Sequence, residues 1–191
     1  MKKNLLISVL YTLVTTFFFG ILYPLFVTVL AKAIFPRQAN GSLIMSGGHL
    51  VGSHLIGQPF TAPEYFWSRP SAAGTAGYDP TASGGSNYAP TNKALIARVD
   101  ASVQALQPTN PGAPIPVDLV TTSGSGLDPD VSPASAEFQV PRVARERGMS
   151  EQDVRALVQK HTQGRQWGFL GEPRVNVLDL NLDLDAVHPM H

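Results

Sequence analysis

The hydrophobic pattern divides the chain into one long apolar stretch and a mixed remainder. Residues 4–31 carry no charged side chain, and roughly 20 apolar residues cross a bilayer core about 30 Å thick. The stretch therefore predicts a transmembrane helix at residues 1–35, tilted or kinked at Pro24. A cleaved signal peptide is the alternative, because two lysines precede the stretch and Ala31-Lys32-Ala33 resembles a cleavage site. Length favours the anchor, since the apolar core of a signal peptide spans about 7–15 residues.

Small or weakly polar residues recur at every fourth position of this stretch. Because a step of four residues nearly completes one helical turn, they form a single gently winding ridge. In lipid such a ridge lets another helix approach closely. Alternatively, the hydroxyls are simply tolerated because they bond to their own backbone. The ridge consists of Ser8, Thr12, Thr16, Gly20, Pro24 and Thr28.

Three helical patterns follow. The first places apolar residues on one face, begins after the N-cap candidate Thr91 and ends at Pro108. Its face contains Leu95, Ile96, Val99, Val103 and Leu106. The second opens with Ser132-Pro133 and should stop at Gly148, while Pro141 predicts a kink or break inside it. The third begins at Ser150, which opens a form of capping box.

Strand patterns are shorter. Residues 50–56 and 117–121 are each consistent with a strand, and the second leads into a turn at 123–126. Apolar and polar residues alternate over 175–184, which predicts a half-buried strand with a bulge near Val177. The acidic residues of that tail are then expected on a solvated face; they are Asp179, Asp183 and Asp185.

Together these patterns predict an α+β protein with two parts. Residues 1–35 form the single transmembrane anchor. Residues 36–191 form a small domain with a short sheet, two or three helices and long Gly/Pro-rich loops. Aromatic residues punctuate the Gly- and Pro-rich region 36–90, which favours ordered loops over disorder.

Charge narrows the possible partners. All 14 acidic side chains follow residue 35, whereas Lys2, Lys3 and Lys32 precede Phe35, so the domain is mildly acidic. It offers no basic patch for nucleic acid. The chain has no cysteine, which excludes disulfides and thiolate nucleophiles. Positive charges near the two ends of the span slightly favour a cytoplasmic N-terminus and an extracytoplasmic domain at 36–191.

The stretch SGGSNYAPTNKAL, residues 83–95, raises the question of a phosphate loop. It fails the spacing of G-x-x-x-x-G-K-[ST] and that of G-x-G-x-x-G. What remains is a glycine turn, an asparagine suited to left-handed backbone and the N-terminus of a helix, which attracts anions. A structural loop and cap is the plainer interpretation.

Catalytic signatures do not appear elsewhere. The motifs G-x-S-x-G, H-E-x-x-H and S-x-x-K are missing. His49 and His54 are spaced for neither one helix face nor one strand face, so no metal site is predicted. Two classes stay open on the residues alone: an accessory subunit of a membrane complex, or a membrane-tethered extracytoplasmic binding protein or enzyme with an unrecognised site.

Several long strings nevertheless resemble one family, the C subunit (KdpC) of the bacterial Kdp-type potassium-transporting P-type ATPase. Trp67 stands where that family usually has a small residue. Besides the N-terminal span, the strings are GSHLIGQPF (52–60), YFWSRPSA (65–72), YDPTASGGSNYAPTNKAL (78–95), DLVTTSGSGLDPDVSP (118–133), FQVPRVARERGMSEQDVRALVQKHT (138–162) and RVNVLDLNLDL (174–184).

The resemblance implies a non-catalytic accessory subunit of a high-affinity, ATP-driven potassium uptake complex in the bacterial inner membrane. Its partners are a potassium-translocating A subunit, an ATP-hydrolysing B subunit, a small F subunit and membrane lipid. It supports assembly and raises the ATP affinity of the B subunit. No cofactor is tightly bound, but the resemblance gives nucleotide-binding candidates: Gln58, Ser83, Gly84, Gly85 and Asn87.

The implied orientation conflicts with direct ATP contact. If residues 36–191 lie outside, a hydrocarbon core of roughly 30 Å separates Ser83 from cytoplasmic ATP. We therefore hypothesise that the domain lies over the ion entrance of the A subunit and acts on ATP affinity by allosteric coupling. In that case the 83–95 stretch forms a rigid turn that presents Tyr78, Asn87 and Tyr88 to a protein surface.

Overall fold

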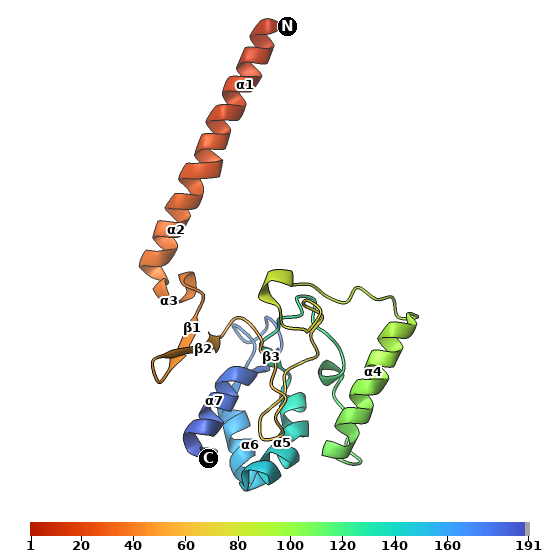
Figure 1. Cartoon of the computed structure of the whole chain (residues 1–191). Coiled ribbons are helices and arrows are strands. Elements are labelled where there is room, and N and C mark those ends of the chain that lie inside the picture. Colours follow the sequence, from red (N-terminus) through yellow and green to blue (C-terminus); the bar gives the residue numbers. More distant parts are fainter. Residues whose placement is uncertain (190–191) are drawn as a thin grey trace. The chain divides into compact units, whose positions relative to one another are not determined.

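The computed structural model describes residues 1–189, and its chain falls into two compact units (Figure 1). The first is Met1–Val51 and the second is Gly52–His191. The architecture is α+β, as predicted: a long apolar helix, then helices mixed with very short strands.

One continuous helix dominates the first unit. It is built from α1 (Lys2–Phe17), a π-helical turn (Phe18–Leu22) and α2 (Tyr23–Ile34). Helix Lys2–Ile34 is long and apolar enough to cross a membrane, with a mean hydropathy of 2.2 and no part of its most apolar window buried. The π-turn ends two residues before Pro24, where the sequence predicted a kink. π-Turns and prolines are each recognised causes of bends in helices.

Two of the ridge hydroxyls bond within this helix. Ser8 donates to the Asn4 carbonyl at 2.9 Å and Thr28 to the Pro24 carbonyl at 2.7 Å. Their hydrogen bonds are thus satisfied without a partner, while the ridge keeps the small profile that helix packing requires. Packing against another helix stays a prediction.

A short hairpin completes this part of the chain. After α3 (Pro36–Ala39), β1 (Leu43–Ser46) pairs with β2 (His49–Ser53). The strand expected at residues 50–56 is therefore displaced toward the N-terminus and is shorter.

Three helices and a small sheet form the core of the second unit. The helices α5 (Pro133–Arg147), α6 (Glu151–His161) and α7 (Val177–Val187) lie beside one another (Figure 1). An antiparallel sheet of β3 (Asp130–Val131), β5 (Arg174–Asn176) and β4 (Thr162–Gln163) adjoins them, in the order β3-β5-β4. Fully buried core side chains include Phe66, Val140, Val143, Val154, Val175, Leu180 and Leu184.

The predicted boundaries of α5 and α6 are confirmed. The Ser132 hydroxyl accepts from the Ser135 N–H at 3.1 Å, and Gly148 closes α5 in the left-handed conformation with a φ of 64°. The Ser150 hydroxyl accepts from the Asp153 N–H at 3.1 Å. The helix α5 runs unbroken through Pro141, so the predicted break does not occur.

Helix α4 (Lys93–Leu106) packs at its C-terminal half only. Its N-cap is Asn92, whose side chain accepts from the Ala94 N–H at 2.8 Å, and not Thr91 as predicted. Leu106 joins a second apolar cluster with Leu119, Val120 and Phe138. Toward the N-terminus Ile96 remains 49% exposed.

Two predicted strands are wrong. Residues 117–119 form a 3-10 turn, Val117–Leu119, with others at Pro80–Ala82 and Gln107–Thr109. The tail is β5 followed directly by helix α7. Asn176 ends the strand and caps the helix, because its side chain accepts from the Asp179 N–H at 3.1 Å. Helical spacing then places Val177, Leu180, Asn181 and Leu184 on one buried face.

Candidate functional site

The loop Ser83–Asn87 lies against the segment Ser123–Gly126. The Gly84 N–H and the Ser83 hydroxyl both donate to the Ser125 carbonyl, at 2.8 and 3.1 Å. A Cβ at Gly85 would approach the Gly124 carbonyl at 3.2 Å, so the two glycine-containing turns are closely packed. These contacts bond the Gly84 N–H and the Ser83 hydroxyl to the domain itself, whereas a phosphate cradle needs N–H groups that point toward a ligand.

Asn87 completes this turn. Its φ of 51° confirms the left-handed conformation expected of the asparagine. Beyond it, Tyr88 lies beneath Arg98 of α4, with 5.7 Å between the guanidinium and the ring centre, and is 46% exposed. Tyr78, by contrast, donates its hydroxyl to the Arg69 carbonyl and is half-buried. It is therefore a structural side chain and does not join Asn87 and Tyr88 on an exposed surface.

Gln58 lies beside the other end of the segment that supports this loop. Its neighbour Gly57 donates to the Leu127 carbonyl at 2.8 Å, and the Gln58 side chain packs against Gly52 so closely that a Cβ there would meet it at 2.2 Å. Residues 123–128 thus support both Gln58 and the Ser83–Asn87 loop, although at opposite ends.

Two buried side-chain amides hold the backbone of Phe66 and Trp67, in the segment that leads from Gln58 to the Ser83–Asn87 loop. Gln139 of α5 accepts from the Trp67 N–H at 2.7 Å and donates to the Trp67 carbonyl at 3.2 Å. Asn181 of α7 does the same for Phe66, at 2.8 and 3.0 Å. We call this pair the amide clamp; each amide supplies the two bonds that a neighbouring strand would otherwise provide.

Arg142 of α5 reinforces the amide clamp. The Arg142 guanidinium donates to the Pro63 and Tyr65 carbonyls and to Gln139, and it stacks on Trp67 with 3.7 Å to the ring centre. Burial lowers the pKa of Arg142 to about 10, so the side chain remains charged at neutral pH. The Trp67 ring supplies the face on which this charge lies.

The acidic residues of the tail are paired within the domain. Asp179 contacts His54 at 2.8 Å, and Asp185 accepts from Arg147 at 2.7 Å. Asp183 accepts from Lys160 and His161 at 2.7 and 2.9 Å, and these hydrogen bonds lower its pKa. The expectation of a merely solvated face is therefore wrong. Among residues 1–189 no group of three His, Asp or Glu side chains is arranged to hold a metal ion.

A polar cleft of about 550 Å³ opens beside β3 and β5. Arg69 pairs with Asp128 at 2.9 Å and Arg174 with Asp130 at 3.0 Å. At one wall burial opposes ionisation of Asp118, but hydrogen bonds from Ser132 and Ser135 outweigh it and lower the pKa of that carboxyl. Burial raises the pKa of Asp130, although the neighbouring charge of Arg174 acts to lower it. The sequence analysis did not single out any of the charged residues of this cleft.

Comparison with known proteins agrees with the resemblance of the strings. The family model "KdpC: K+-transporting ATPase, c chain" matches residues 5–186. A "Potassium-transporting ATPase KdpC subunit" from Koribacter versatilis is 64% identical over 190 residues, covering 100% of this chain and 98% of the relative. Subunits of the same name from Methylococcus capsulatus and Burkholderia mallei are each 57% identical, with 97% and 90% of both chains covered. The chain therefore belongs to the KdpC family, the c chains of potassium-transporting ATPases.

Proposed function

We propose that this chain is a non-catalytic accessory subunit of an ATP-driven potassium uptake complex. It supports assembly with the potassium-translocating, ATP-hydrolysing and small F subunits, and it raises the ATP affinity of the ATP-hydrolysing one. Full-length similarity to KdpC subunits carries the proposal. The membrane-length helix Lys2–Ile34 supports a place within a membrane complex.

The domain lies on the extracytoplasmic side in this proposal, so its effect on ATP is indirect. Coupling between separate sites is typically worth about 5- to 150-fold in affinity. The hydrogen bonds of Ser83 and Gly84 to the Ser125 carbonyl support a structural role for the loop. An acidic domain above an ion entrance does not repel potassium.

Kinetics of the purified complex test the proposal. Complexes with the full chain and with residues 1–35 alone should differ in the ATP concentration for half-maximal hydrolysis, by about fivefold or more. Equal values in two intact complexes would contradict the affinity role. Failure of the truncated chain to assemble would assign the domain to assembly.

Loop variants then separate coupling from contact. Ser83→Ala removes the hydroxyl that reaches Ser125, and Asn87→Gly keeps the left-handed backbone while removing the amide. Coupling predicts unchanged half-saturating ATP for both variants. An increase in both, matched by Gln58→Ala, would instead make Gln58, Ser83, Gly84, Gly85 and Asn87 a nucleotide site and place the domain in the cytoplasm.

A further inference from the structure

A rigid hairpin leaves the small sheet between β4 and β5. We call residues 163–172 the aromatic hairpin. At its base Gln163 pairs with Arg174, and further out Gln166 and Leu170 exchange both backbone hydrogen bonds at 2.9 Å. Arg165 and Glu172 join its two arms through an ion pair at 2.6 Å. Backbone hydrogen bonds and this ion pair thus join the two arms of the hairpin up to the turn that carries Trp167.

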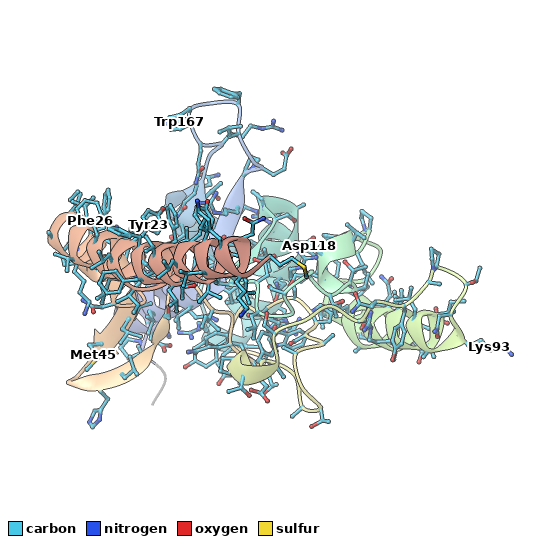
Figure 2. The ribbon with its side chains drawn as sticks, turned by 90° about the horizontal axis from the view of Figure 1, so that it is seen from above. Tyr23, Phe26, Met45, Lys93, Asp118 and Trp167 are labelled. Atoms are coloured by element: carbon cyan, nitrogen blue, oxygen red, sulfur yellow. The ribbon has the colours of Figure 1, made fainter. Side chains whose placement is uncertain are left out.

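The tip of this hairpin is apolar and exposed. Trp167 is 85% exposed, Phe169 68% and Leu170 42%. Figure 2 shows Trp167 at the outer end of a projecting loop. A cluster of large apolar side chains in water marks an interaction site, and tryptophan is enriched among the residues that dominate binding energies.

The backbone at Trp167 is strained. Its φ of 52° lies in the left-handed region, which a bulky residue rarely adopts, and Gly168 follows with a φ of 82°. Glycine or asparagine at position 167 would relieve this strain. Strain of this kind clusters at sites where it presents a functional group. A rigid loop also reduces the entropy that a flexible one loses on binding.

Charge beside the hairpin distinguishes a protein partner from a lipid surface. Residues 172–174, where the hairpin returns to β5, form one wall of the polar cleft described above. Four carboxylates line that cleft, against the guanidinium groups of Arg69 and Arg174; they are Asp118, Asp128, Asp130 and Glu172. Because Arg165 pairs with Glu172, one carboxylate, that of Asp118, remains in excess. Loops that bind anionic lipid combine aromatic residues with surplus Lys or Arg. An excess of acids attracts a basic side chain of a protein instead.

We propose that the aromatic hairpin docks the domain onto another subunit of the ATPase, with Trp167 in an apolar pocket and a partner Lys or Arg at the acid-lined cleft. This inference rests on the proposed role as an accessory subunit and names the surface that performs it. The rigid tip supplies the apolar anchor and the cleft supplies the charge that sets its orientation.

Co-purification of the full-length chain with the other subunits tests the inference. Trp167→Asn should lower retention of the chain in the complex on the order of tenfold, and Trp167→Phe much less. Glu172→Lys should also weaken retention, and more so at low salt, where charges act over longer distances. The matched control is Val187→Ala, an apolar side chain that is 57% exposed at the end of α7.

Two results would overturn this docking surface. One is wild-type retention of Trp167→Asn, with the domain labelled from outside; the accessory role would then stand without the hairpin. The other is quenching of Trp167 fluorescence by brominated lipid when the full chain is reconstituted alone in nanodiscs, measured as the difference from Trp167→Asn. That quenching would assign the hairpin to the membrane. Labelling of the domain from the cytoplasm only would reject the proposed function itself.

Discussion

The core helices α5–α7 and the segment 58–79 are held in place by different interactions. The helices bury an apolar face and carry caps at their own ends, so most of their stabilisation is local or hydrophobic. The segment 58–79 has no helix or strand, and single side chains from α5 and α7 satisfy its backbone. The stability of a helix is therefore spread over the many residues of its apolar face, whereas the position of the segment 58–79 depends on a few individual side chains.

The largest expected effect is at Arg142. Replacement by Met leaves the carbonyls of Pro63 and Tyr65 without their donor and removes one of the two donors to the Gln139 side-chain oxygen. The free energy of unfolding should fall by about 4 kcal/mol. Denaturant unfolding of the full chain, followed by circular dichroism, measures it. Arg145→Met on the same helix is the control, because Arg145 is 62% exposed; equal losses from both variants would contradict the comparison.

The second prediction removes half of the amide clamp. Asn181→Leu keeps the size of the side chain but leaves both backbone groups of Phe66 unpaired inside the core. The expected loss in unfolding free energy is about 3 kcal/mol. Asn110→Leu breaks one bond, to the Phe138 carbonyl at 3.0 Å, at a half-buried position and should cost less. A smaller loss at Asn181 than at Asn110 would count against the clamp.

A third prediction concerns Asp118, which joins the 3-10 turn Val117–Leu119 to the start of α5. Its hydrogen bonds with Ser132 and Ser135 hold the folded-state pKa below the unfolded value of about 3.9. The stabilisation is therefore complete above that value and lost as pH falls through the folded-state pKa. Asp118→Ala should lower stability by about 2 kcal/mol at pH 7. In an acid titration its difference from the wild type should shrink, whereas Asp100→Ala should show little difference throughout.

The smallest effect tests a cap. Asn92→Ala removes the acceptor for the Ala94 N–H and should destabilise the start of α4 by about 1 kcal/mol. Thr91→Ala should change little. Hydrogen exchange of the first turn of α4 distinguishes them, and faster exchange in the Thr91 variant alone would restore the cap predicted from sequence.

Sequence patterns were reliable where structure is local. Ser132, Gly148 and Ser150 mark helix ends because capping depends on neighbouring residues only. The tail misled because its leucines satisfy two periods at once: alternate positions suit a strand, while residues 177, 180, 181 and 184 suit a helix. Contacts of α7 with β5 and α6, and the Asn176 cap, select the helix.

The candidate site was less accessible to prediction. The left-handed Asn87 follows from its residue type, but the contact of Gly84 with Ser125 spans distant parts of the chain. The partners of Gln139 and Asn181 have no local signature either. One signal was available: once α7 is a helix, Asn181 is a polar residue on an apolar face, which indicates a buried hydrogen-bonding role.

The most direct test of the account is the side of the membrane on which the domain lies. The chain has no cysteine, so a single one reports its own position. Lys93→Cys suits this purpose because Lys93 is exposed at the start of α4 (Figure 2). A cysteine in a short extension before Met1 provides the opposite control.

Intact cells that express the assembled complex are treated with a membrane-impermeant maleimide. The account predicts labelling at position 93 before the cells are opened, and labelling of the N-terminal cysteine only afterwards. The reverse pattern would place the domain beside cytoplasmic ATP. It would contradict both the extracytoplasmic position and the allosteric route to ATP affinity.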